Sequence, residues 1–280
     1  MKVQEMFFIL VLGSALATEM TGAYRFEIAT SLIVAPYKVN SLGEDALYAN
    51  DLVLTVADGV GSWSDIGVDA GLYSRKLMFF TDKFFHENKA AYTKDPKSLV
   101  IRCAQENKEI GTSTIVVTIL DSHTAKLNTA NIGDSCYIIL RSNADNSAFD
   151  IVHKSPDQQH GFNYPFQIGT KGDSPTTAVV NSHQLKIGDL VIVGSDGLFD
   201  NVYDETVAQV AHYFREKSLK ELADALSRIA FKLSLDRAYK SPFSMAALKV
   251  GKKMIGGKTD DIAVVVGKVA KVDATTRASE

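Results

Sequence analysis

Three apolar runs in this chain each meet an acidic residue at one end. They are residues 52–57 before Asp58, residues 190–193 shortly before Asp196, and residues 262–266 directly after Asp260 and Asp261. Short runs rich in Val and Ile and bounded by glycines are typical of buried β-strands. A carboxylate at the end of a buried strand is costly unless a cation compensates it, whereas an Asp-Gly pair can also simply cap a turn. Either role fits each acid taken alone.

The rest of the pattern switches between the strand and helix periods. We expect further strands over residues 26–34, 48–56, 114–120, 126–132, 136–141, 150–153 and 185–193. From Gly67 the apolar residues recur every three to four positions, which indicates an amphipathic helix of roughly five turns. A second helix is expected over residues 98–109, and a third after Asp204 as its cap. Ser218 and Glu221 form a capping box for a fourth helix.

Composition favours one large domain. The chain has 280 residues, 46% of them hydrophobic, a net charge of -3 and a pI near 6.1. It can therefore bury a substantial core, and it lacks the clustered basic surface that binding to nucleic acid requires. Cys103 and Cys136 have neither disulfide-framework nor metal-ligand spacing, so we expect them to fill apolar positions.

The N-terminal residues 1–22 contain the one targeting signal. An apolar run over residues 6–17 ends in Ala15-Leu16-Ala17, which resembles a signal-peptide cleavage site, and the run is too short for a transmembrane anchor. A secretory or endomembrane location follows from that interpretation. Against it, Lys2 is the only basic side chain of the leading segment and Glu5 lies beside it. Mitochondrial and cytoplasmic locations stay open.

Acidic residues recur wherever a loop meets one of the best predicted strands. Beside Asp58, Asp196 and Asp260, the pair Glu44-Asp45 precedes the strand over residues 48–56. A donor set rich in oxygen and nearly free of sulfur and imidazole suits Mg²⁺ or Mn²⁺ rather than Zn²⁺. If Glu44, Asp58, Asp196 and Asp260 converge, two divalent ions would balance their four charges. Two-metal sites of this kind support phosphoryl displacement by water.

Five motifs occur together in an order that resembles a known family. They are Gly43-Glu44-Asp45-Ala46, Ala57-Asp58-Gly59-Val60-Gly61, Asn131-Ile132-Gly133-Asp134-Ser135, Gly194-Ser195-Asp196-Gly197-Leu198-Phe199-Asp200 and Lys258-Thr259-Asp260-Asp261-Ile262. The chain resembles the metal-dependent serine/threonine protein phosphatases of type 2C from about Ser31 to Val269. It is most similar to the organellar branch described as T-cell-activation or azaserine-resistance phosphatases, through Gln158 to Gln167 and Ser241-Pro242-Phe243.

This resemblance implies an α+β fold of four layers, in which two antiparallel sheets are flanked by helices. The phosphatase domain would cover residues 23–271, and residues 272–280 would form a flexible tail. Two Mg²⁺ or Mn²⁺ ions per active site are implied, with phosphorylated proteins as substrates and a monomeric chain. A hydroxide bridging the metals would attack phosphorus in phosphoserine or phosphothreonine directly.

The resemblance also implies roles for individual residues. Asp58 would bridge both ions, the Gly59 carbonyl would bind one, and Asp196 and Asp260 would bind the other. Glu44 would reach the site mainly through water. Asp45, Asp134 and Asp261 would support the surrounding structure.

Two positions depart from the family pattern. Many relatives have an arginine four residues before the Glu, where this chain has Asn40, and Lys38 is the expected substitute for binding phosphate. Many relatives have a His two residues after the bridging Asp, where this chain has Val60; His160 is the candidate to protonate the leaving oxygen. A pseudophosphatase that binds phosphoproteins or a regulatory partner is therefore the alternative function.

A run of lysines precedes the last acidic pair. Lys249, Lys252, Lys253 and Lys258 carry positive charge toward Asp260. Such a run is typical of a solvated face, and attraction of an anionic substrate is the other interpretation.

Overall fold

The computed structural model of the chain describes residues 23–38 and 42–272. The predicted targeting segment 1–22, the predicted tail beyond Val272 and Asn40 lie outside the described residues.

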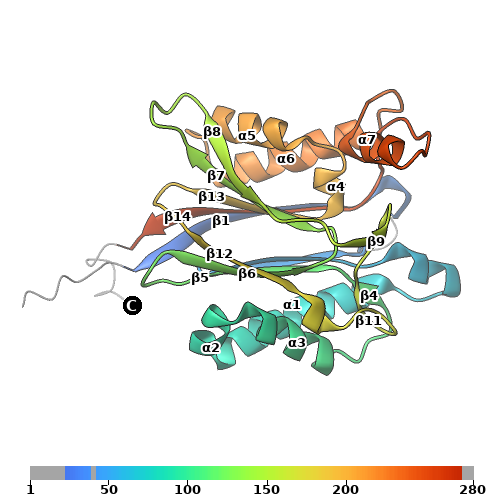
Figure 1. Ribbon diagram of the computed structural model, residues 1–280, viewed down its shortest axis with the longest axis horizontal. Helices are drawn as coiled ribbons and strands as arrows, with labels where there is room; N and C mark the ends of the chain where they lie inside the picture. The colour runs from blue at the N-terminus through green and yellow to red at the C-terminus, as the bar shows by residue number, and fades with distance from the viewer. Residues whose placement is uncertain (1–22, 39–41, 273–280) are drawn as a thin grey trace, which may run out of the picture.

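Two five-stranded antiparallel sheets stack face to face (Figure 1). The order in the first sheet is β1 (Tyr24–Ile33), β14 (Ile262–Lys271), β13 (Leu190–Gly194), β7 (Cys136–Ser142) and β8 (Phe149–Lys154). The order in the second sheet is β12 (Val179–Gln184), β6 (Lys126–Ile132), β5 (Ile115–Leu120), β3 (Val53–Asp58) and β2 (Asp45–Ala49). The fold class predicted from the sequence is confirmed.

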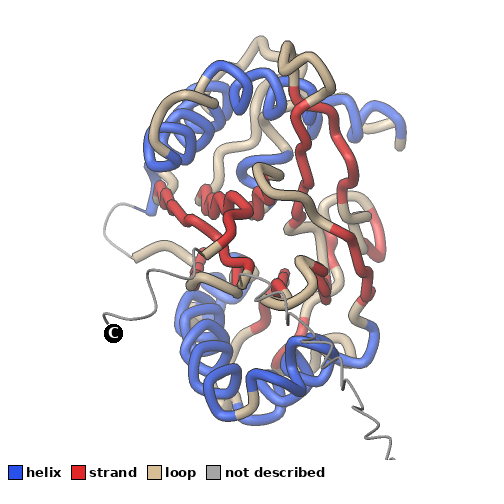
Figure 2. Tube along the Cα trace, turned by 90° about the vertical axis from the view of Figure 1, so that its left-hand side faces the viewer, coloured by secondary structure: helices blue, strands red, loops and turns tan. Residues whose placement is uncertain are grey.

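Helices cover the outer face of each sheet, as Figure 2 shows from the side. The first sheet is covered by α4 (Asp196–Phe199), α5 (Asp204–Tyr213) and α6 (Leu219–Ser234), with α7 (Pro242–Lys249) at one end of that layer. The second sheet is covered by α1 (Ala70–Glu87), α2 (Lys89–Lys94) and α3 (Pro96–Glu106). Short elements complete the chain: η1 (Pro36–Lys38), η2 (Gly61–Ile66), β4 (Thr112–Ser113), β9 (Gln159–Gly161), β10 (Tyr164–Pro165), β11 (Ile168–Gly169) and η3 (Pro175–Thr177).

The central strands are continuous apolar runs because both of their faces are buried. Residues 53–57 of β3 are all buried, since one face of the strand meets the other sheet and the opposite face meets α1. A second apolar cluster fills the space between the first sheet and helices α4 to α6, with Ile192 and Val264 from the sheet and Leu226 from α6. Strands buried on both faces lose the alternation of apolar and polar residues that marks half-exposed strands.

Two details of the sequence interpretation are wrong. Asp204 is the first residue of α5, whose cap is Tyr203 without a capping side chain, and the Asp204 carboxylate pairs with Lys154 at 2.8 Å. The strand expected over residues 185–193 begins only at Leu190, because the preceding residues form a turn that contains Gly188 at φ 87°. The predicted capping box of Ser218 and Glu221 is present at the start of α6.

No helix within the described part of the chain has both the length and the apolar character needed to cross a membrane.

Candidate functional site

Strand ends from both sheets deliver acids to one end of the sandwich. In the second sheet, Asp58 at the end of β3 is paired in register with Asp45 at the start of β2. In the first sheet, β13 ends just before Asp196, and its antiparallel neighbour β14 begins just after Asp260 and Asp261. Antiparallel pairing therefore places the end of one strand beside the start of the next at the same edge.

An open cleft with a volume of about 850 Å³ lies at this end of the sandwich. Glu44, Asp58, Asp196 and Asp260 all contribute to its wall, so the structure brings the four acids together. The other lining residues named in the sequence analysis are Lys38, Gly59, Val60, Gly61, Gly67, Asp134, Gln167 and Lys258. The catalytic and metal-binding roles of these residues stay predictions.

Two glycines let the backbone approach closely around the cleft. A Cβ at Gly59 would lie 2.8 Å from the Ala70 carbonyl oxygen and 2.9 Å from that of Glu44. A Cβ at Gly197, in the first turn of α4, would lie 1.9 Å from the backbone oxygen of Asp261. Only glycine fits where the backbones come this close, so these two residues fix the spacing between the loops that carry the acids.

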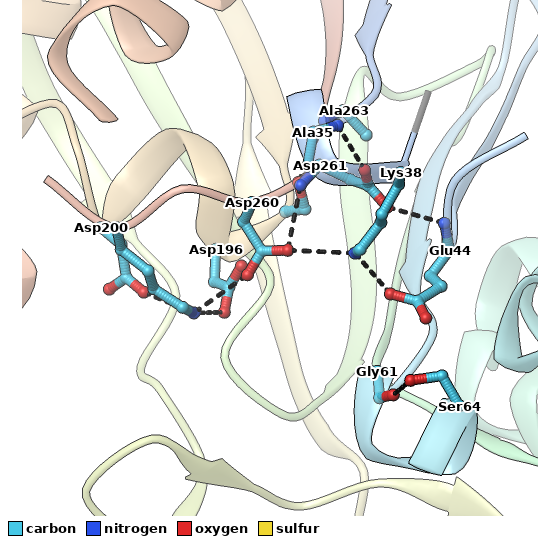
Figure 3. Close-up of polar contacts among 12 residues, drawn as sticks. Ala35, Lys38, Glu44, Gly61, Ser64, Asp196, Asp200, Asp260, Asp261 and Ala263 are labelled. Carbon is cyan, nitrogen blue, oxygen red and sulfur yellow. Dashed lines mark hydrogen bonds and ion pairs between the residues drawn. The ribbon is translucent and has the colours of Figure 1, made fainter. Parts of the chain in front are cut away.

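Two lysine ammonium groups lie among the carboxylates. Lys38 pairs with Glu44, with Asp261 at 3.0 Å and with Asp260 at 3.5 Å (Figure 3). Lys258 pairs with Asp196, with Asp200 at 2.9 Å and with Asp260 at 3.4 Å. Asp260 thus lies between the two lysines and shares both of them.

The lysines stay charged in this setting. Burial alone would lower the pKa of Lys38, but the hydrogen bond to Glu44 and the charges of Asp260 and Asp261 outweigh burial and raise it. Burial likewise disfavours the charged form of Lys258, and the charges of Asp196 and Asp200 overcome it and raise the pKa well above its usual value. Both side chains therefore act as fixed positive charges.

The acids, in contrast, are held back from ionising. Burial and the nearby charges of Asp45 and Asp196 raise the pKa of Asp58 well above its usual value. Burial, followed by the charge of Asp196, raises the pKa of Asp134 to about 8. Burial also raises the pKa of Asp196 and of Asp260, despite the partly compensating charge of Lys258. The two lysines do not fully offset the concentration of carboxylates, and additional positive charge would stabilise it.

The donor set fits hard divalent cations. Asp196 Oδ1 and Asp134 Oδ1 are buried and accept no hydrogen bond from any described residue. Buried carboxylate oxygens without a partner are the atoms that Mg²⁺ or Mn²⁺ coordinates. In the conformation described for residues 23–38 and 42–272, no three His, Cys, Asp or Glu side chains are grouped around a common point as metal ligands. Ammonium groups lie between the acids instead.

The predicted supporting acids hold the loops around the cleft. Asp261 accepts hydrogen bonds from the backbone N–H of Ala35 at 2.8 Å and of Glu44 at 2.7 Å, which ties the loop around η1 to the start of β2. Asp134 Oδ2 accepts from the Gln159 side chain at 2.9 Å. Asp45 is buried beside Asp58, and burial and the charge of Asp261 raise its pKa.

The two departures from the family pattern have different outcomes. Lys38 lines the cleft, so it is in place to meet a phosphate, and Asn40 lies outside the described residues. Val60 also lines the cleft. His160 is absent from the lining residues: its Nε2 pairs with Asp173 at 2.9 Å, and its ring stacks on Phe166 at 4.0 Å between centroids. This placement argues against His160 as the proton donor.

Sequence reasoning missed the surroundings of Lys258. The interpretation of a solvated lysine face is wrong for this residue, which is partly buried and pairs with three acids. The Asn201 side chain donates to the Lys258 carbonyl oxygen at 2.8 Å and accepts from the Lys258 N–H at 2.9 Å. Asp200 is the last residue of the Gly194–Asp200 motif and Asn201 directly follows it, and no periodic signal marks them as partners of a lysine 57 or 58 residues further on.

Comparison with known proteins places these observations in a family. The family model described as Stage II sporulation protein E (SpoIIE) matches residues 49–269. The "Probable protein phosphatase 2C 71" of Oryza sativa subsp. japonica is 41% identical over 246 residues, 86% of this chain and 51% of that protein. The "Protein phosphatase PTC7 homolog" of Xenopus laevis is 35% identical over 236 residues, 78% of this chain and 77% of that protein. The chain thus spans about half the length of the rice relative.

Solved structures show the same architecture. The X-ray structure of the photosystem II phosphatase PBCP matches with a TM-score of 0.80 and 32% identity, over 88% of this chain and all of that one. The catalytic domain of the serine threonine protein phosphatase PstP, solved with two manganese ions, matches with a TM-score of 0.58 and 18% identity over 89% of this chain and 100% of that one. At that lower identity the likeness shows the fold alone.

Proposed function

Because the chain belongs to the protein phosphatase 2C family, we propose that it hydrolyses phosphoserine and phosphothreonine in proteins with the help of two Mg²⁺ or Mn²⁺ ions. The observation that carries the proposal is the convergence of Glu44, Asp58, Asp196 and Asp260 on one open cleft. Three segments far apart in the sequence supply these acids, and all of them match the family motifs.

The residues that would hold the cations are Asp58, Asp196, Asp260 and the Gly59 carbonyl, with Glu44 acting through water. Bound divalent cations would activate the attacking water and neutralise charge on the transferred phosphoryl group. The raised pKa values of Asp58, Asp196 and Asp260 support this assignment, because a cation favours the ionised form that burial disfavours.

The chain itself supplies orientation and charge for the substrate. Lys38 is a fixed positive charge at the cleft wall and would contact the phosphate as a point charge, without the two parallel hydrogen bonds of an arginine. Water adds to phosphorus as the ester oxygen leaves, and that oxygen takes up a proton to become the seryl or threonyl hydroxyl. No histidine is present among the lining residues that the structure describes, so we propose that solvent water provides this proton.

The alternative of a pseudophosphatase is not favoured. A pseudophosphatase of this fold would be expected to have lost acids from the cleft, and Glu44, Asp58, Asp196 and Asp260 are all present on its wall. Metal-dependent turnover decides between the two functions.

The test is hydrolysis of p-nitrophenyl phosphate and of a phosphothreonine peptide with Mn²⁺ or with EDTA. We expect turnover only with the metal, and a loss of at least about a hundredfold in kcat for Asp58→Asn and Asp196→Asn, on the scale of removing a preorganised electrostatic group. Asp150→Asn, which changes an exposed acid on β8, is the matched control and should be unaffected. Absence of turnover in the intact chain, or full activity in both cleft variants, contradicts the proposal.

A further inference from the structure

A basic and apolar surface follows α7 at the same end of the sandwich as α4 and β9 (Figure 1). Residues 248–255 are all exposed. Four of them are large apolar residues with high exposed fractions: Leu248 at 58%, Val250 at 57%, Met254 at 45% and Ile255 at 78%. Lys249, Lys252 and Lys253 alternate with them. We call residues 248–255 the docking segment.

The docking segment is anchored at both ends. Near its start, the Lys252 N–H donates to the Ala247 carbonyl oxygen of α7 at 2.9 Å, and Gly251 makes the turn with φ 76°. At its far end, Gly256 donates to the Tyr239 carbonyl oxygen at 3.0 Å and accepts from the Ser241 hydroxyl at 2.6 Å. The apolar side chains are therefore presented to solvent by a fixed backbone.

The docking segment is continuous with the rim of the cleft. The Lys252 ammonium lies 5.0 Å from the centre of the Phe162 ring, and that ring lies 4.9 Å from the Phe243 ring of α7. Asn163 and Tyr164, which directly follow Phe162, line the cleft. From its other end the chain runs through two glycines to Lys258, which also lines the cleft.

The charge of this surface differs from that of the chain. The whole chain has a net charge of -3, whereas the docking segment contains three lysines and no acid. No ion pair within the described residues involves Lys249, Lys252 or Lys253. The backbone of Arg237 packs against Gly256 and adds another exposed base, and Asp236 is the exposed acid beside it. Exposed cations that have no acidic partner attract acidic groups, and covering exposed apolar side chains with a partner lowers the free energy.

We propose that the docking segment binds an acidic and apolar stretch of a protein substrate, next to the phosphorylated residue that enters the cleft. This inference rests on the proposed phosphatase function. The lysines would pair with Asp or Glu of the substrate, and the four apolar side chains would contact its apolar residues. The surface would thus select among phosphoproteins and take no part in the chemistry.

The test compares two phosphothreonine peptides, one with Glu and Leu beside the phosphothreonine and one with Gln and Ser in their place. Each peptide is made in two versions, with the varied residues either before or after the phosphothreonine. The variant Lys249→Ser/Lys252→Ser/Lys253→Ser should raise KM for the acidic peptide about tenfold at low ionic strength, the effect of three exposed ion pairs. The increase should shrink in 0.5 M salt because the ions screen exposed charges. KM for the neutral peptide and turnover of p-nitrophenyl phosphate should not change.

A matched variant, Lys83→Ser/Lys89→Ser/Lys94→Ser, removes three exposed lysines from α1 and α2 on the other helical layer and should leave every value unchanged. A second variant, Val250→Ser/Ile255→Ser, tests the apolar part and should raise KM for the peptide that contains Leu.

The possible failures are distinct. If the unmodified chain does not hydrolyse p-nitrophenyl phosphate, the phosphatase function itself is contradicted. Retained turnover with equal KM values for both peptides overturns the docking proposal alone. If the triple lysine variant keeps its KM for the acidic peptide but no longer sediments with anionic phosphatidylserine vesicles that bind the unmodified chain, the surface serves a membrane and the proposal is also wrong.

Discussion

Replacing Lys258 by Met removes an ammonium group that contacts Asp196, Asp200 and Asp260 together. The Met side chain is of similar length and leaves the packing of the stem nearly intact. Asp196 and Asp200 then lose their shared counter-charge, and Asp260 keeps its 3.5 Å ion pair with Lys38 and the hydrogen bond from the Asp261 N–H at 3.0 Å.

The size of the effect follows from burial. The exposed fraction of the Lys258 side chain is 15%, and those of its partners lie between 12% and 27%. Removing one partner of a buried ion pair costs about 3 kcal/mol or more in free energy of unfolding. At about 2 °C per kcal/mol for a chain of this length, the melting temperature without metal should fall by about 6 °C or more.

The assay is thermal unfolding in EDTA and again with saturating Mn²⁺. If bound cations supply the charge that Lys258 supplies without them, Mn²⁺ should remove most of the difference between Lys258→Met and the unmodified chain. Lys253→Met, an exposed lysine of the docking segment, is the control and should shift the melting temperature by no more than about 1 °C. Equal stability of Lys258→Met in EDTA, or the same loss with and without Mn²⁺, would refute the reasoning.

Three further predictions follow from the site. Asp134 has a folded pKa raised to about 8, so the native chain binds more protons than the unfolded chain between about pH 4 and 8. The free energy of unfolding in EDTA should therefore fall as pH rises through that window. Asp134→Asn should reduce the difference in free energy of unfolding between pH 5 and pH 8, measured by urea titration at each pH. An unchanged difference counts against the burial argument. Gly197→Ala should cost about 3 kcal/mol in urea unfolding, because its Cβ would meet the Asp261 backbone oxygen, whereas Gly161→Ala has open space and should cost less than about 0.5 kcal/mol. Lys38→Met should raise KM for p-nitrophenyl phosphate about tenfold, because it loses a charged hydrogen bond to the phosphate. Lys38→Arg keeps a positive charge and should leave KM low. Equal KM values in the two variants would show that Lys38 does not bind the phosphate.

Local sequence patterns predict the strand ends of this site well. The strands before Asp58 and Asp196 and after Asp261 are continuous apolar runs, and each one forms a central strand of a sheet. Burial on both faces makes such runs unambiguous. Local patterns do not predict how these strands pair. The pairing of Asp45 with Asp58, and of β13 with β14, depends on the register between separate segments. Only the resemblance of five motifs to a family implied that arrangement.

The side chains that contact the acids were harder to predict. Lys258 and the other three lysines look alike in the sequence, yet Lys258 is partly buried among carboxylates and Lys249, Lys252 and Lys253 are exposed. Tertiary contacts distinguish Lys258 from them: Asn201 holds its backbone by two hydrogen bonds, and its ammonium pairs with acids from distant segments. The sequence around His160, which forms the short strand β9, gave no local signal of where the ring points, and a contact with Asp173 orients the ring.

The most direct measurement of the central claim is the anomalous scattering of Mn²⁺ in crystals of this chain. The account predicts two manganese peaks in the cleft, one contacted by Asp58 and the Gly59 carbonyl and the other by Asp58, Asp196 and Asp260, and no peaks in crystals of Asp58→Asn. Absence of manganese from the cleft at saturating Mn²⁺, or peaks that survive unchanged in Asp58→Asn, would contradict it.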